Sequence, residues 1–325
     1  MKNVDVLLGR HAGLFSNFFS VLGALAMAEK TGRAVAVRFD EGAYLEAARG
    51  PNWWEYYFER VSDCDPMSLL VESRVQGKAE AANLAFQVVF QREKSSQLIR
   101  RYIRLLGHVT AGLDEFWREN VGNRYCIGLH LRGTDKVLET PLPDWQRLFG
   151  FAERLADKRP ADSWRFFVAT DEEKLLDAAK ARFGGLVVSQ KVFRSTDGHP
   201  LHKPFPKTSR NLQPEMAMLE RPRYDIGLEA IRDALLLAKC DALIGGFSNL
   251  LLAAAAFNPA IPCIPGSTFD PRDRDEARDD RVKMLAQSLV SVSTALERLS
   301  RTVSLDHDRR RRLSFLPNLL RRRAD

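Results

Sequence analysis

A phosphate-binding chemistry is suggested first by residues 130–139, which read His-Leu-Arg-Gly-Thr-Asp-Lys-Val-Leu-Glu after an apolar run. Alternate residues of a strand share a face, so His130 and Arg132 are expected to point the same way. A guanidinium is planar, permanently charged and able to donate two parallel hydrogen bonds, which suits Arg132 to clamp a diphosphate. Gly133 lets the chain turn away closely. An ordinary surface loop with an Arg–Asp pair is an equally weighted interpretation.

A second polar segment follows the apolar run 166–169, where Thr170 and Asp171 precede a predicted helix. A third lies at 245–249, where two glycines come before Ser248 and Asn249 at another helix start. A helix start with a hydroxyl and backbone N–H groups can bind an anion. In both segments the alternative is a plain helix cap. The glycine pair fits neither a Walker loop nor the GxGxxG pattern.

The amino-terminal turn, residues 9–17, is a weaker signal of the same kind. It follows an apolar run, contains Gly13 and opens a predicted helix, so its backbone amides could meet a ligand.

Alternating apolar patterns predict the elements that must position these residues. Strands are expected at 4–8, 33–39, 125–131, 166–169, 186–189, 242–244 and 261–264, and helices at 15–30, 82–107, 145–157, 172–183, 224–239, 249–257 and 283–299. The order β-α-β, twice repeated, predicts an α/β fold of two Rossmann-like domains facing across a cleft. The expected divisions are 1–115, 116–300 and a basic tail at 301–325. Ligands of such sheets bind beyond the carboxyl ends of the strands, which would gather the three polar segments.

Composition sets the class of protein. The 325 residues are 45% hydrophobic and 28% charged, which excludes a disordered or collagen-like chain. The net charge is +7, but residues 301–325 hold eight Arg and three Asp and supply +5 of it. This tail is interpreted as a solvated end, with a peripheral contact to an anionic membrane surface as the alternative and nucleic acid least favoured.

Cysteine spacing and the amino terminus suggest a compartment. Four scattered cysteines without a CxxC pair predict reduced thiols and a cytoplasmic setting. The first apolar run is too short and too early-charged for a signal peptide.

In their order along the chain, these segments resemble the motifs of the fucosyltransferase superfamily that includes the nodulation, core α-1,6- and protein O-fucosyltransferases. Residues 130–136 are similar to its first motif, His-x-Arg-Arg-Thr-Asp-Lys. Residues 167–171 are similar to its second, residues 233–249 to its third, and residues 13–17 to its amino-terminal glycine-rich turn. The resemblance spans residues 9–259, although residues 41–107 match nothing recognisable.

The resemblance implies a GT-B architecture and an inverting, metal-independent transfer from a GDP-sugar, with GDP-fucose as donor and a glycan hydroxyl as acceptor. It implies that Arg132 holds the β-phosphate, that Asp233 and Ser248 meet the nucleotide, and that His130 lines the same pocket. Glu139 is the approximate counterpart of the catalytic base, offset by one residue. Two departures stand out: the second Arg of the first motif is Gly133 here, and Asn249 stands where the α-1,6 branch has Gln.

The chemistry needs a cation for the departing diphosphate and a carboxylate for the acceptor proton. Arg132 supplies the first, with Lys136 as a second cation, and Glu139 and Asp171 are the candidates for the base. Aromatic residues at 53–58 and Trp145 are candidates for a sugar-stacking wall, with ordinary core packing as the favoured alternative. Residues 191–223 are interpreted as a lid. A transferase for another nucleotide sugar and a non-catalytic sugar- or nucleotide-binding protein remain alternatives.

Overall fold

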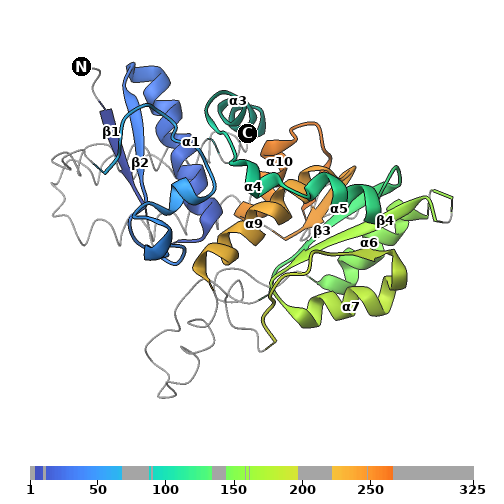
Figure 1. Ribbon diagram of the computed structural model, residues 1–325. Coiled ribbons are helices and arrows are strands. Elements are labelled where there is room, and N and C mark those ends of the chain that lie inside the picture. Colours follow the sequence, from blue (N-terminus) through green and yellow to red (C-terminus); the bar gives the residue numbers. More distant parts are fainter. Residues whose placement is uncertain are drawn as a thin grey trace, which may run out of the picture. The chain divides into compact units, whose positions relative to one another are not determined.

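The computed structural model describes residues 4–9, 12–67, 88, 91–133, 144–157, 159–160, 162–196, 222–246 and 248–265. All of them belong to one compact unit, Met1–Phe269 (Figure 1). The division of the chain near residue 115 stays a prediction, and the basic tail at 301–325 and the helix expected at 283–299 lie outside the described residues.

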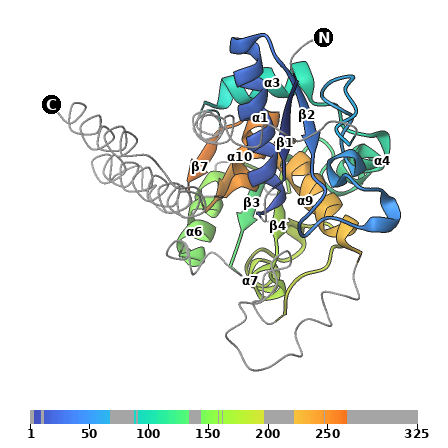
Figure 2. The same ribbon diagram turned by 90° about the vertical axis from the view of Figure 1, so that its left-hand side faces the viewer.

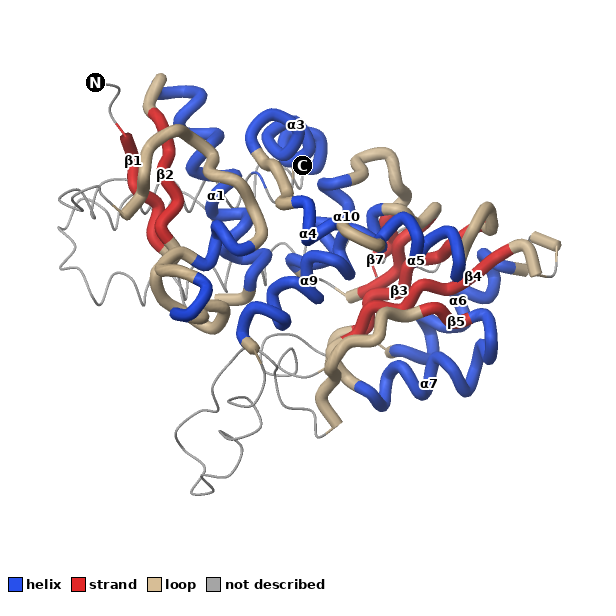
Figure 3. Tube along the Cα trace, in the orientation of Figure 1, coloured by secondary structure: helices blue, strands red, loops and turns tan. Residues whose placement is uncertain are grey.

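A five-stranded parallel sheet carries the polar segments. Its strands are β3 (Tyr125–Leu131), β4 (Trp164–Thr170), β5 (Val187–Val188), β6 (Ala242–Gly245) and β7 (Cys263–Pro265). Their order is β5-β4-β3-β6-β7. Figure 3 labels β3, β4, β5 and β7 of this sheet. The chain runs outward from β3 to one edge and then returns to build the other. The switch of direction beside β3 is the place where open parallel sheets bind ligands.

Helices cover both faces of this sheet (Figure 1). They are α6 (Trp145–Ala156), α7 (Glu173–Phe183), α9 (Arg223–Ala238) and α10 (Asn249–Phe257), with a 3-10 turn, η4 (Gly184–Leu186), after α7. Ile127 and Leu129 of β3 pack in the core under α6 and α7, whereas Cys126 packs in the core under α9 and α10. Because strand residues alternate, His130 and Arg132 belong to the face that α9 covers.

The amino-terminal part has a smaller parallel pair. Strand β1 (Val4–Leu8) pairs with β2 (Ala34–Arg38), and α1 (Leu14–Thr31) connects them and packs on this pair in Figure 2. Gly32 ends α1 with φ 67°, as expected of a glycine stop. The 3-10 turns η1 (Ala47–Arg49) and η2 (Trp53–Tyr56) follow.

The aromatic residues at 53–58 are core residues. Trp53, Trp54, Tyr57 and Phe58 are each at most 1% exposed, and Trp54 stacks on Phe58 with ring centroids 4.2 Å apart. The core interpretation is thus confirmed for them, and the sugar-stacking wall is wrong. Trp145 packs against the core under α6 and α7.

The helix expected at 82–107 is wrong at its carboxyl end. Helix α3 (Arg92–Tyr102) stops early, and after four extended residues come α4 (Gly107–Thr110) and α5 (Leu113–Asn120). Leu105 forms an antiparallel bridge with Phe58, and Leu106 N donates to Tyr57 O at 3.0 Å. Backbone groups of the distant aromatic segment therefore outweigh the local helical pattern.

Elsewhere the expected elements agree closely with the structure. The strand at 125–131 and the helix at 249–257 are confirmed at both ends. The strand expected at 186–189 is shorter, and the one at 166–169 is longer at both ends.

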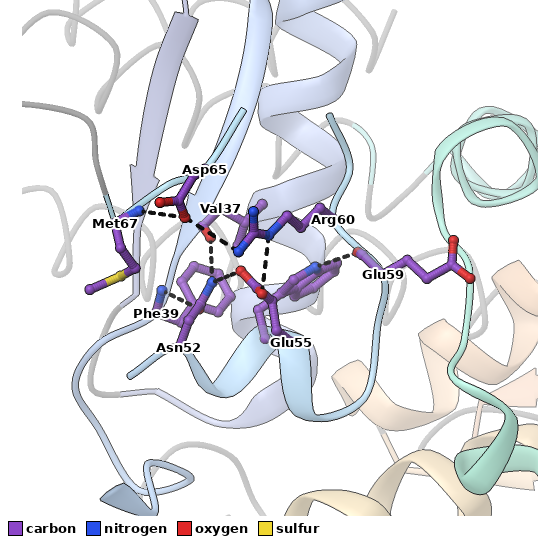
Figure 4. A network of polar contacts seen from close by, with 9 residues as sticks. Val37, Phe39, Asn52, Glu55, Glu59, Arg60, Asp65 and Met67 are labelled. Atoms are coloured by element: carbon purple, nitrogen blue, oxygen red, sulfur yellow. Dashed lines mark hydrogen bonds and ion pairs between the residues drawn. The ribbon is translucent and has the colours of Figure 1, made fainter. Parts of the chain in front are cut away.

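Asn52 joins the end of β2 to the aromatic core (Figure 4). Its Oδ1 accepts from Phe39 N and its Nδ2 donates to Val37 O, both at 2.9 Å, while the same Nδ2 lies 2.9 Å from Glu55 Oε1. Asn52 is 3% exposed, so water cannot replace it as a partner of these two backbone groups.

Replacing Asn52 by alanine is expected to lower the free energy of unfolding by about 2 kcal/mol, because two buried backbone groups lose their partner. The measurement is urea denaturation followed by tryptophan fluorescence. Arg60, whose side chain is 46% exposed and pairs with Glu55 and Asp65, is the matched control. Its alanine variant should lose less than about 1 kcal/mol. Equal losses in the two variants would contradict this role of Asn52.

Candidate functional site

Arg132 and Asp171 meet at the carboxyl edge of the five-stranded sheet, directly after β3 and β4. Arg132 Nε lies 3.8 Å from Asp171 Oδ2, and both side chains are 23% exposed. Gly133 N donates to Asp171 Oδ1 at 3.5 Å. His130, the last-but-one residue of β3, is 5% exposed. The edge therefore presents a partly exposed guanidinium whose long ion pair is weaker than a bidentate one.

Gly133 lies against the carboxylate of Glu172. A Cβ at position 133 would lie 2.7 Å from the Glu172 carboxyl atoms. The Glu172 side chain is 3% exposed and pairs with Lys174 Nζ at 3.0 Å. The space beside Gly133 is therefore filled by a buried acidic group. A side chain at position 133 would have to displace this carboxylate.

Asp233 comes to the same edge from α9. It is 9% exposed, and its Oδ1 accepts a hydrogen bond from Gln190 Nε2 at 2.5 Å. Burial raises the pKa of Asp233 to about 7; the hydrogen bond from Gln190 and the charge of Arg194 oppose the rise, and the carboxylates of Glu229 and Asp171 add to it. The Asp233 carboxyl therefore changes its charge near neutral pH.

Ser248 is the N-cap of α10, so the cap interpretation is confirmed. It is 1% exposed, and its Oγ accepts from Leu250 N at 3.2 Å. The hydroxyl still has a proton to donate. A Cβ on Gly245, at the end of β6, would lie 2.7 Å from His130 O, so the ends of β3 and β6 are in close contact. Asn249 is the first residue of α10.

Neither Thr170 nor Asp171 caps helix α7, so the helix-cap interpretation of this segment is wrong. The N-cap of α7 is Glu172, and no side chain caps that helix. Thr170 Oγ1 instead accepts from Glu172 N at 3.2 Å. Asp171 is thus left to face Arg132.

Several predicted residues lie elsewhere. Gly13 is the N-cap of α1 on the two-stranded sheet, where its carbonyl accepts from Ser16 N and Asn17 N. Lys136, Glu139 and most of the expected lid, residues 197–221, lie outside the described residues.

Within the described ranges, no three His, Cys, Asp or Glu side chains gather to hold a metal ion. No helix in this part of the chain is both long and apolar enough to cross a bilayer.

Three residues of this edge were not predicted as site residues from the sequence: Glu172, Gln190 and Arg194. Gln190 follows β5 by two residues, so the rule that places ligands beyond strand ends would have found it. Nothing in the local sequence indicates that Glu172 is buried beside Gly133.

The comparison with known proteins gives a fold. No protein-family profile matches the sequence, and no curated protein matches it. Among solved structures, NodZ α-1,6-fucosyltransferase soaked with GDP-fucose is 19% identical, with a TM-score of 0.53 over 80% of this chain and 94% of that one. NodZ from Bradyrhizobium is 18% identical, with a TM-score of 0.52 over 82% of this chain and 96% of that one. The mixed helix and parallel-sheet fold of this chain is therefore similar to that of NodZ.

Proposed function

We propose that this protein is a glycosyltransferase that transfers fucose from GDP-fucose to a glycan hydroxyl, with inversion and without a metal ion. The observation that carries the proposal is the meeting of Arg132, Asp171, Asp233 and the Ser248 helix start at one edge of a parallel sheet. The fold likeness to NodZ, which has been crystallised with GDP, supports it.

The departing GDP needs positive charge, because breaking the glycosidic bond leaves negative charge on the β-phosphate. Arg132 is the group proposed to meet it. Its contact with Asp171 is an ion pair at 3.8 Å, longer than a hydrogen bond, and we propose that the diphosphate replaces this carboxylate as a partner of the guanidinium. Lys136 is proposed as a second cation, and the amides that open α10 as further donors.

The nucleoside is assigned to the α9 side of the edge. Asp233 supplies a carboxylate for the N–H and O–H donors of the nucleoside, His130 lines the same space, and Ser248 and Asn249 complete it. The backbone amides of the amino-terminal turn at Gly13 are proposed to bind the nucleotide sugar as well.

Inversion follows from a single displacement. The acceptor hydroxyl attacks the anomeric carbon from the face opposite GDP, the bond to the diphosphate breaks, and a carboxylate takes the hydroxyl proton. Glu139 and Asp171 are the two proposed bases. Asp171 faces Arg132 at the carboxyl edge of the sheet.

A second candidate function is a sugar- or nucleotide-binding protein without catalysis. Gly133 favours it, because the buried Glu172 carboxylate occupies the space in which the motif has its second Arg. A transferase for a different nucleotide sugar is the other alternative. We propose a cytoplasmic location, because the scattered cysteines predict reduced thiols.

A nucleotide panel separates these functions. GDP and GDP-fucose should each raise the melting temperature by several degrees at 100 times their dissociation constants, since that excess adds about 2.7 kcal/mol. UDP and ADP should not. Release of GDP from GDP-fucose, unchanged by EDTA, would support a metal-independent transferase. Binding without turnover would favour the binding protein, and stabilisation by UDP alone would overturn the donor assignment.

A further inference from the structure

The segment between β5 and residue 195 is fastened to the site by a buried arginine. Arg194 is 6% exposed at its side chain, which is rare for a guanidinium. Its Nη2 donates to Gln190 O at 2.8 Å, and its Nη1 lies 3.4 Å from Val192 O. Arg194 thus holds together the segment that contains it.

The same segment is attached to the carboxyl end of β4. Ser195 N donates to Asp171 O at 2.8 Å, and Glu173 N donates to Ser195 O at 3.0 Å. Arg194 Nη1 also lies 3.7 Å from Glu173 Oε2. The backbone of Asp171, a proposed site residue, is therefore positioned by this segment.

Gln190 connects Arg194 to Asp233. Its carbonyl accepts from Arg194 Nη2, and its side-chain amide donates to Asp233 Oδ1 at 2.5 Å. Arg194 Nε is buried and has no hydrogen-bond partner within the described part of the chain. A buried cation that is incompletely bonded is costly to hold, so a compensating role near carboxylates is expected.

We propose that Arg194 is a positioning residue, which fastens Gln190 against Asp233 and places a positive charge behind the Asp233 carboxylate. This inference rests on the proposed function, in which Asp233 meets the nucleotide. The charged groups that act on Asp233 are Arg194 from this segment, Asp171 from the end of β4 and Glu229 from α9 itself. His130, near the end of β3, is 5% exposed. Arg194 is the cation of this set.

The sign of the pH effect follows from burial. The pKa of Asp233 is about 7 in the folded chain, above its ordinary 3.8, so the folded state holds this proton more tightly than the unfolded state. The corresponding stability is fully present below about pH 4 and is lost as pH rises through about 7. Removing the charge of Arg194 would raise the folded pKa further.

The test is a double-mutant cycle of Arg194→Gln and Asp233→Asn, with urea stability measured from pH 5 to 9 on the full chain without ligand. In the wild-type protein, the free energy of unfolding should stop falling once the pH passes the pKa of Asp233, about 7. Arg194→Gln is expected to move this inflection to a pH about one unit higher, and to have no such effect in the Asp233→Asn background. Arg182→Gln, which breaks an ion pair with Glu153 between α7 and α6, is the matched control and should leave this inflection in place.

Other outcomes would overturn the proposal. If Arg194→Gln lowers stability equally at every pH in both backgrounds, the arginine is merely structural. Should Arg194→Gln not fold, Arg194→Lys decides, because lysine keeps the charge and loses the guanidinium fork. Its inflection must stay at the wild-type pH while its stability drops; an upward shift in this variant would refute the charge role.

GDP binding by calorimetry gives a separate result. For a one-unit rise in pKa, Arg194→Gln should weaken GDP about eightfold at pH 6.5 and less than about twofold at pH 9. If wild-type protein binds no GDP, the proposed function fails, whereas the ligand-free cycle still decides the role of Arg194.

Discussion

Replacing Arg132 by alanine is expected to slow GDP release from GDP-fucose by about 10²-fold or more, equivalent to about 2.7 kcal/mol or more in the activation barrier. The reason is electrostatic. Negative charge grows on the diphosphate as the sugar leaves, and Arg132 is the partly exposed guanidinium at the end of the central strand. The measurement is the initial rate at saturating donor, with water or a glycan as acceptor.

Two variants calibrate this result. Arg132→Lys keeps a charge but not the planar fork, so it should recover part of the rate. Arg165→Ala removes an arginine from the amino end of β4, where its Nη1 donates to Trp164 O, and should leave the rate within about threefold. Wild-type turnover in Arg132→Ala would show that another group neutralises the diphosphate.

Replacing Gly227 by alanine is expected to lower the free energy of unfolding by about 2–3 kcal/mol. Gly227 lies on α9, and a Cβ there would collide with the Tyr57 hydroxyl and lie 2.5 Å from Tyr57 Cζ. Tyr57 is fully buried, donates to Tyr224 O at 2.8 Å and stacks on the Tyr224 ring at 5.3 Å. The ring cannot move without breaking these contacts, so overpacking outweighs the higher helix propensity of alanine.

Gly150→Ala is the matched control for this prediction. Gly150 lies inside α6, where a Cβ would be 3.7 Å from the nearest atom outside the helix backbone, Arg154 Nη1. Its replacement should stabilise the protein by about 0.5–1 kcal/mol. Tyr57→Phe removes the closest atom and should reduce the cost of Gly227→Ala by about 1 kcal/mol. If Gly227→Ala is as harmless as Gly150→Ala in urea denaturation, α9 does not pack on Tyr57 as described.

The sheet was predictable because its signals are local. Strand β3 is a mostly apolar run that is followed by Arg132, and α10 begins after a serine cap, so the sequence predicts the bounds of both. The meeting of Arg132 and Asp171 follows from topology, because parallel strands bring their carboxyl ends to one edge.

The remaining features depend on partners distant in sequence. Residues 103–106 have a helical apolar pattern, but the backbone of Tyr57 and Phe58 pairs with them and extends them. The aromatic residues at 53–58 match a sugar-binding wall in composition, and only the packing shows that they are core. The Gln190–Asp233 hydrogen bond joins residues 43 apart, which no local pattern encodes.

Gly133 departs from the resembled motif, and a buried carboxylate lies beside it in the structure. From the sequence, the glycine is a missing arginine of the resembled motif. In the structure, the buried Glu172 carboxylate fills that position, and Lys174 neutralises it at 3.0 Å. Under the proposed function, Arg132 is then the arginine of this turn that meets the donor, with Lys136 as the second cation.

A crystal structure with GDP bound would show directly whether Arg132 binds the diphosphate. We expect the Arg132 guanidinium to leave its 3.8 Å contact with Asp171 and to donate two hydrogen bonds to the diphosphate, with Asp233 on the nucleoside. GDP bound at a different edge of the sheet, with Arg132 still turned to Asp171, would contradict the proposed function.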